Sequence, residues 1–286
     1  MLVAGIVGAT QDFLTDFTFN IFDLFNTCCN NAINFLKVSP DVFANGKPWE
    51  VVQNLMPTFE TVAGSLAALF IMIAFIKSTT DAKEEIVSLQ TLTKLFIRIG
   101  LVEGLVKLAI NICQAIYQSA ALLAGIVGAD FTDLKLPDSY VDLVNNCDNE
   151  ITLIGGFISS FLCSIVAAIL GMALLFIVYQ RIFKCCVIVP FAPMAFSTVT
   201  LGGSGAHVAT SFIKTVISFA FEAILIAISL ALAAAVIGDN NSTFDLSNLG
   251  ETSQILLYPV VSCFNMGIIV GAVKGADSIV RRAMGV

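Results

Sequence analysis

The sequence is short of charge, and this excludes most soluble classes. Charged residues make up 12% of the 286 positions, whereas soluble domains average about 25%. Apolar residues account for 57%, and the mean hydropathy is +0.92. They also come in long blocks, which a soluble core does not require. The sequence therefore predicts an all-α fold of the polytopic membrane type and disfavours a soluble protein with buried helices.

Histidine is almost absent, which removes several kinds of chemistry. The only histidine is His207, so His-rich metal sites and the usual Ser-His-Asp arrangement are excluded. The glycine-rich run "LGGSGAH" lacks the lysine of a phosphate-binding loop. We therefore expect no catalytic residue, no cofactor and no metal, and we predict that the protein is not an enzyme.

Five apolar segments are long enough to cross a bilayer, which takes about 20 mainly apolar residues in a helix. We place these spans at about 58–76, 101–128, 151–179, 212–237 and 255–273. A helical membrane domain then covers residues 55–286, and residues 1–54 form an extracytoplasmic N-terminal region.

The distribution of Lys and Arg predicts the orientation of these spans. Segments 1–54, 129–150 and 238–253 together hold 3 basic and 14 acidic residues. The alternating segments, 77–99, 180–210 and 274–286, hold 9 basic and 4 acidic residues. Because basic residues concentrate in cytoplasmic loops, we expect the N-terminus outside and the C-terminus in the cytoplasm.

The N-terminal region has the pattern of an amphipathic helix. Its apolar residues recur every three or four positions: Leu14, Phe17, Ile21, Phe25, Cys28, Ala32 and Leu36. Acidic and amide residues lie on the other faces, and no Lys or Arg precedes Lys37. A cleavable signal peptide is therefore not expected. An acidic helix favours packing against the protein's own outer face or a partner, with anchoring at the lipid surface as the alternative.

Charged residues inside the spans are candidate functional positions, because ionisable groups in a bilayer are costly. Glu103 and Lys107 are one helical turn apart, which predicts an internal ion pair. Lys214 lies near the inner end of its span and can extend to the interface. Glu222 lies near the middle of a span with no charge one turn away. It either packs as a protonated acid or lines a hydrated path.

Three of the eight cysteines fall in predicted outer segments: Cys28, Cys29 and Cys147. A disulfide from Cys147 to either of the other two would tie the N-terminal helix to the second outer loop. The remaining five fall within spans or on the reducing cytoplasmic side.

Segment 185–197 is apolar but too short to span. As a helix, its stretch from Cys185 to Phe196 would be about 18 Å long, against a hydrocarbon core of about 30 Å. Pro190 and Pro193 each remove a backbone donor and interrupt a helix. Broken backbone is tolerated at membrane depth only where protein or water covers it. The pattern predicts a bent element on the cytoplasmic side.

The region from about 151 to 286 resembles the TrbL-like conjugal transfer proteins, polytopic membrane subunits of type IV secretion systems. In that family a basic residue closes a long span, an Ala-Pro motif follows, a glycine-rich turn comes next, and a lysine opens another span. The positions that match are Arg181, Ala192, Pro193, Met194, Gly202, Gly203, Gly205 and Lys214. The tail resembles family endings through Ala276, Asp277, Arg281 and Arg282.

This resemblance implies a non-enzymatic channel or scaffold subunit of a conjugative type IV secretion system in a bacterial cell membrane, with a Gram-positive source. It implies a homo-oligomeric ring, with a pentamer as the expected form. Its expected partners are membrane lipid, assembly and coupling ATPases, a cell-wall hydrolase and a transient DNA–protein substrate. The alternatives are a small-solute or ion transporter that uses Glu222, and a structural scaffold without conduction.

Overall fold

Nearly all of the described residues lie in helices. The computed structural model describes residues 2–81, 89–128, 131, 133–136, 138–147, 149–238, 246 and 249–285. Within these residues there is no strand, which confirms the all-α class. The α-helices are α1 Leu2–Leu36, α2 Lys47–Asp81, α3 Leu89–Val127, α4 Asp138–Asn145, α5 Glu150–Ile188, α6 Ala192–Ser197, α7 Gly203–Gly238 and α8 Glu251–Met284. Short 3₁₀ turns cover Phe43–Gly46, Val189–Phe191 and Thr198–Leu201.

Membrane-spanning character is supported by four helical stretches. Among the described residues, those long and apolar enough to cross a bilayer are Phe43–Ile76, Glu150–Leu201, Gly205–Ile237 and Glu251–Met284. Each contains one predicted span. The predicted span 101–128 lies in α3, which is not one of the four.

The chain divides into two compact units, each assembled from segments that are far apart in the sequence. The first unit comprises Met1–Lys37, Leu123–Tyr179 and Ile224–Ser278, and the second comprises Val38–Leu122, Gln180–Ala223 and Ile279–Val286. Helices α3, α5, α7 and α8 contribute to both units. Both units therefore include residues from each side of the predicted boundary after residue 54.

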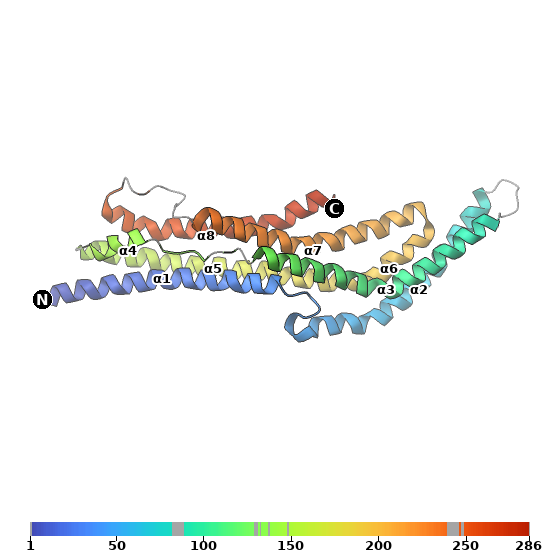
Figure 1. The fold of residues 1–286 in the computed structure, drawn as a ribbon, viewed down its shortest axis with the longest axis horizontal. Coiled ribbons are helices and arrows are strands. Elements are labelled where there is room, and N and C mark those ends of the chain that lie inside the picture. The colour runs from blue at the N-terminus through green and yellow to red at the C-terminus, as the bar shows by residue number, and fades with distance from the viewer. Residues whose placement is uncertain are drawn as a thin grey trace. The chain divides into compact units, whose positions relative to one another are not determined.

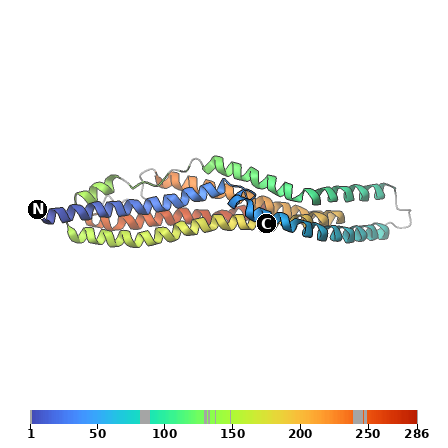
Figure 2. The ribbon, with the colours of Figure 1, turned by 90° about the horizontal axis from the view of Figure 1, so that it is seen from below.

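In the first unit, α1 lies beside α5 (Figures 1 and 2). The hydroxyls of Thr18 and Ser160 are 3.2 Å apart, and the rings of Phe13 and Phe157 are 5.5 Å apart. The seven apolar positions of the predicted pattern, from Leu14 to Leu36, are buried or half-buried, while the aspartates of α1 are exposed. The apolar face of α1 is thus covered by its own chain.

The Asn26 side chain of α1 holds the loop before α4, because it both donates and accepts a hydrogen bond. The Asn26 amide nitrogen donates to the Leu134 carbonyl at 2.8 Å, and the Leu134 amide donates back to Asn26 Oδ1 at 3.0 Å. Gln11 donates to the carbonyls of Asn145 and Cys147 at 3.1 and 3.0 Å. These bonds satisfy backbone groups that helix ends and loops leave open.

In the second unit, α2 packs against α6 and its flanking 3₁₀ turns. Phe59 of α2 meets the Phe191 ring edge-on, with the ring centroids 5.2 Å apart. The linker before α2 contains three successive residues with positive φ, Ala44, Asn45 and Gly46. These residues form the 3₁₀ turn that leads directly into α2.

Candidate functional site: a buried charged cluster on α5 and α7

Two basic residues of α5 meet one face of α7. The Arg181 side chain is fully buried, and its Nε donates to the Phe219 carbonyl at 3.4 Å. One turn further along, Lys184 Nζ lies 3.3 Å from Glu222 Oε1. Phe219 and Glu222 are also one turn apart, so the pairs repeat along the same helix faces. All four residues belong to the second unit.

The cluster contains more positive than negative charge. Lys184 pairs with the carboxylate of Glu222, of which only 3% of the side chain is exposed. Within the part of the chain that the structure describes, the two terminal nitrogens of Arg181 make no hydrogen bond. Taking a cation out of water costs several kcal/mol unless its partners compensate. The site is therefore suited to hold an anionic group, or to stabilise a nearby carboxylate.

Two further residues extend this cluster. Arg281, near the end of α8, lies over the Phe219 ring at 5.8 Å from its centroid. Such a cation–π contact is worth about 0.5–1 kcal/mol at exposed sites. Tyr117 of α3 is buried within electrostatic range of Arg181. Helices α3, α5, α7 and α8 therefore meet at this point of the second unit.

The proline segment follows directly after the cluster. Helix α5 ends at Ile188, and a 3₁₀ turn with Pro190 leads into the six-residue α6 with Pro193. Each proline lies in the first turn of a short helical piece, where the backbone nitrogen does not need to donate a helical hydrogen bond. The predicted interruption of the helix is present, and the chain turns here so that α7 runs back (Figure 1).

Two glycines in the turn after this segment are required, one for its backbone conformation and one for lack of space. Gly202 has φ +69°, and a Cβ there would lie 2.7 Å from the Arg98 Nη1 atom. At Gly205 a Cβ would collide with the Thr198 carbonyl oxygen. The Thr198 hydroxyl in turn donates to the Gly205 carbonyl at 2.9 Å. Two of the glycines in the TrbL-like pattern are thus sterically required.

The other predicted positions lie apart from this cluster. Ala192 is buried at the start of α6, Gly203 begins α7, and Lys214 is exposed on α7. Glu103 and Lys107 form the predicted ion pair at 2.8 Å, with both side chains largely exposed.

The structure does not bring together the three cysteines of the predicted disulfide. Cys28, Cys29 and Cys147 are all free. The Cys147 carbonyl is bonded to Gln11, which precedes Cys28 by about 25 Å of helix at a rise of 1.5 Å per residue. A disulfide needs Cα atoms within about 7 Å. Cys28 instead contacts α5 at Gly171. The charge pattern placed the three cysteines on one side of the membrane. It does not give the distance along the α1 axis between Cys28 and the point where Cys147 docks.

Sequence reasoning also missed Lys184 and Phe219. Lys184 was counted only as a cytoplasmic charge, although it follows Arg181 by one turn and so shares its helix face. A search for a basic residue to match the isolated Glu222 could have found it. No sequence signal indicates that the Phe219 carbonyl accepts a hydrogen bond from Arg181.

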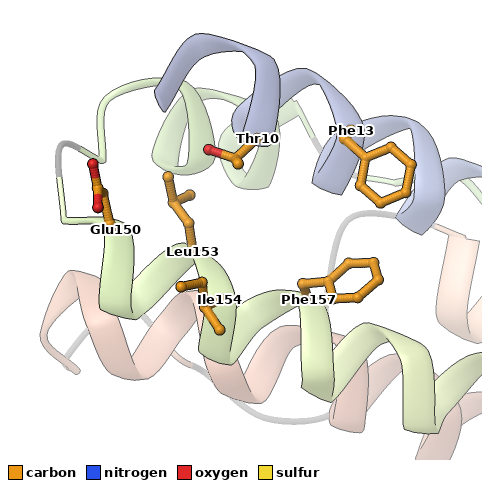
Figure 3. A pocket seen from close by; sticks show the side chains of 6 residues that line it. All are labelled: Thr10, Phe13, Glu150, Leu153, Ile154 and Phe157. Atoms are coloured by element: carbon orange, nitrogen blue, oxygen red, sulfur yellow. The ribbon is translucent and has the colours of Figure 1, made fainter. Parts of the chain in front are cut away.

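The first unit contains a separate pocket between α1 and α5. It has a volume of about 250 Å³ and is lined by Thr10, Phe13, Glu150, Leu153, Ile154 and Phe157. Figure 3 shows Glu150 at one end and the two phenylalanine rings at the other. The mainly apolar lining suits an apolar group, and none of the predicted site residues lies in it.

No protein-family model, curated protein or solved structure matches this chain.

Proposed function

We propose that this chain is a membrane channel or scaffold subunit of a conjugative type IV secretion system. In this role it forms part of the path for DNA–protein transfer across the cytoplasmic membrane of a Gram-positive bacterium, and it is not an enzyme. One observation carries the proposal: the residues of the TrbL-like resemblance lie at constrained places. Arg181 is fully buried against α7, Gly202 has a positive φ that favours glycine, and Gly205 has no space for a side chain.

The proposed topology has five spans, with the N-terminus outside and the C-terminus in the cytoplasm. It rests on the alternation of basic and acidic segments in the sequence. The span 101–128, in α3, is added to the four helical stretches that are apolar enough to cross a bilayer. In this orientation the proline segment lies on the cytoplasmic side, and the loop that contains Leu134 lies on the outer side.

The proposed working form is a ring of identical chains, with a pentamer as the expected number. A conduit for DNA needs several chains, because five helices of one chain pack into a filled bundle. In the most apolar window of Phe43–Ile76, only 6% of the residues are buried within the chain itself. Lipid and neighbouring copies would cover the rest. Assembly and coupling ATPases and a cell-wall hydrolase are the proposed protein partners.

A mating assay tests the proposal. Deletion of the gene should abolish DNA transfer between cells, and the intact gene should restore it. Gly205→Ala should also reduce transfer by at least about tenfold, because the new Cβ collides with the Thr198 carbonyl and displaces the turn. Gly271→Ala is the matched control, since a Cβ there meets no atom within 4 Å. Normal transfer in the deletion strain would reject the proposal.

The second candidate is a small-solute or ion transporter in which Glu222 is the ion or proton site. Its support is the burial of Glu222 beside Lys184, since buried ionisable pairs mark many ion pathways. Glu222→Gln retains the shape and removes the charge. If this variant loses solute or proton flux while DNA transfer stays normal, the transporter reading is favoured. If the gene is needed only for DNA transfer, the transporter hypothesis is rejected.

A further inference from the structure

Helix α3 has a line of polar residues along one face. The line consists of Glu103, Lys107, Asn111, Gln114 and Gln118. At 3.6 residues per turn these five positions fall within about 80° of one another. Asn111 and Gln118 are exposed, and more than half of each side chain in the Glu103–Lys107 pair is exposed. We call this set the polar stripe.

The other two faces of α3 differ from the polar stripe. One is buried against the rest of the second unit and is made mainly of small or aromatic residues: Val102, Ala109, Cys113, Tyr117 and Ala120. The other is exposed and apolar, and includes Leu101 and Leu108. The helix thus has a protein-facing side, an apolar side suited to lipid, and a polar side that suits neither.

Asp41, in the linker between α1 and α2, contacts the outer part of the polar stripe. Gln114 and Gln118 each donate to Asp41 Oδ2, at 2.9 and 2.8 Å. Burial raises the pKa of Asp41, but hydrogen bonds from Ser39 and the two glutamines outweigh it, so that the pKa lies below its ordinary value. The carboxylate accepts both amide donors, and hydrogen bonds of this kind favour its ionised form. Asp41 meets α3 close to the middle of the predicted span 101–128.

An ionised carboxylate and a polar stripe at this depth cannot face hydrocarbon. Charged side chains near the bilayer centre are costly and face a bundle interior or a water-filled cavity. The bundle interior of this chain is already on the opposite side of α3, where Tyr117 and Cys113 are buried. Lipid is therefore excluded on the side of Asn111, Lys107 and Glu103, which leaves water or another copy of this chain beside the stripe.

We propose that the polar stripe of α3 lines the water-filled lumen of an assembly of copies of this chain. This inference rests on the proposed function, because it takes α3 as the fifth span and the chain as a ring subunit. Each copy would present its stripe to the lumen and its Leu101–Leu108 side to lipid or a neighbour. Residues of the stripe would then be pore-lining positions.

The charges beside the stripe give the lumen a sign. Glu60 of α2 lies within electrostatic range of Lys107. Together with Asp41 and Glu103, it leaves each copy with more acidic than basic groups along this surface. A ring of such copies repeats this acidic surface around the lumen, and acidic rings favour cations. Water-soluble cationic probes should therefore reach the stripe more readily than anionic probes of equal size.

Accessibility of single added cysteines tests the inference. The natural cysteines are buried or half-buried, so they can remain in place as a low background. Asn111→Cys and Gln118→Cys sample the stripe, and Leu101→Cys and Leu108→Cys are the controls on the exposed apolar face of the same helix. Leu108 and Asn111 differ in height by only about 4.5 Å. Each variant is expressed in the donor strain with the complete secretion system, and open membranes are treated with a charged, water-soluble thiol reagent.

We expect the stripe cysteines to react at least about tenfold faster than the controls, because the thiolate forms readily only in water. Equal reaction at all four positions would overturn the inference, since α3 would then lie outside the bilayer. Lack of reaction at Asn111→Cys and Gln118→Cys would also overturn it, since the stripe would then be covered by protein. Neither result would alter the outcome of the deletion mating assay, so failure of the inference is separable from failure of the proposed function.

Discussion

Lys184 Nζ lies 3.3 Å from Glu222 Oε1, and this buried contact joins α5 to α7. Arg181 makes its own bond to the same face of α7, one turn away. The two helices are thus tied by charge at the point where α5 is about to end in the proline segment. The glutamate that has no charged neighbour in its own helix obtains one from another helix.

Removing only one member of this pair should destabilise the protein. Lys184→Met leaves the Glu222 carboxylate buried without its cation, which typically costs about 3 kcal/mol or more. The double variant Lys184→Met/Glu222→Gln removes both charges and should recover most of that loss. Thermal unfolding of the detergent-purified protein measures the effect. If the double variant is no more stable than Lys184→Met, the pair does not act as an ionic contact.

Added cysteines at two exposed positions should report the orientation of the chain. Asp142 is exposed on α4, and His207 is exposed near the start of α7. Asp142→Cys should react with an impermeant thiol reagent in intact cells, because α4 lies outside in the proposed topology. His207→Cys should react only after the cells are opened. The reverse pattern would contradict the orientation inferred from the Lys and Arg distribution.

The stability of the turn between α1 and α2 should depend on acid. The pKa of Asp41 lies below its ordinary value of 3.8, so its hydrogen bonds from Gln114 and Gln118 stabilise the folded state above that pH. This contribution is lost as the pH falls through the folded-state pKa. The protein should therefore unfold at lower temperature in this acid range. Asp41→Asn should weaken the dependence, and an unchanged acid profile would argue against the assigned role of the carboxylate.

The proline segment should be needed for DNA transfer but not for membrane insertion. Replacing Pro190 and Pro193 by alanine favours a continuous helix by about 3 kcal/mol per proline in a helix interior. Helix α5 would then extend beyond Ile188 and displace α6, which packs on α2. We expect DNA transfer to fall by orders of magnitude at normal membrane levels of the protein. Normal transfer at normal levels would show that the bend is dispensable.

Much of the site could be predicted from local sequence, and part of it could not. The break at Pro190 and Pro193 and the Glu103–Lys107 pair follow from short-range rules, because a missing backbone donor and a one-turn spacing act within a single helix. The Lys184–Glu222 contact links positions far apart in the chain. No local rule states which faces of two helices meet.

The sequence by itself determined the helical class, the apolar stretches long enough to span, and the positions where helices end. These depend on composition and on backbone chemistry close in the chain, so periodicity and proline placement are sufficient to find them. Only the tertiary structure decided which groups from distant parts of the chain meet. Arg181 meets the Phe219 carbonyl, and Asp41 meets the glutamines of α3. Cys28 packs on Gly171 rather than on Cys147. The physical reason is that a one-dimensional pattern gives the face and height of a residue on its own helix. The rotation and axial shift of one helix against another come from packing of the whole side-chain surface.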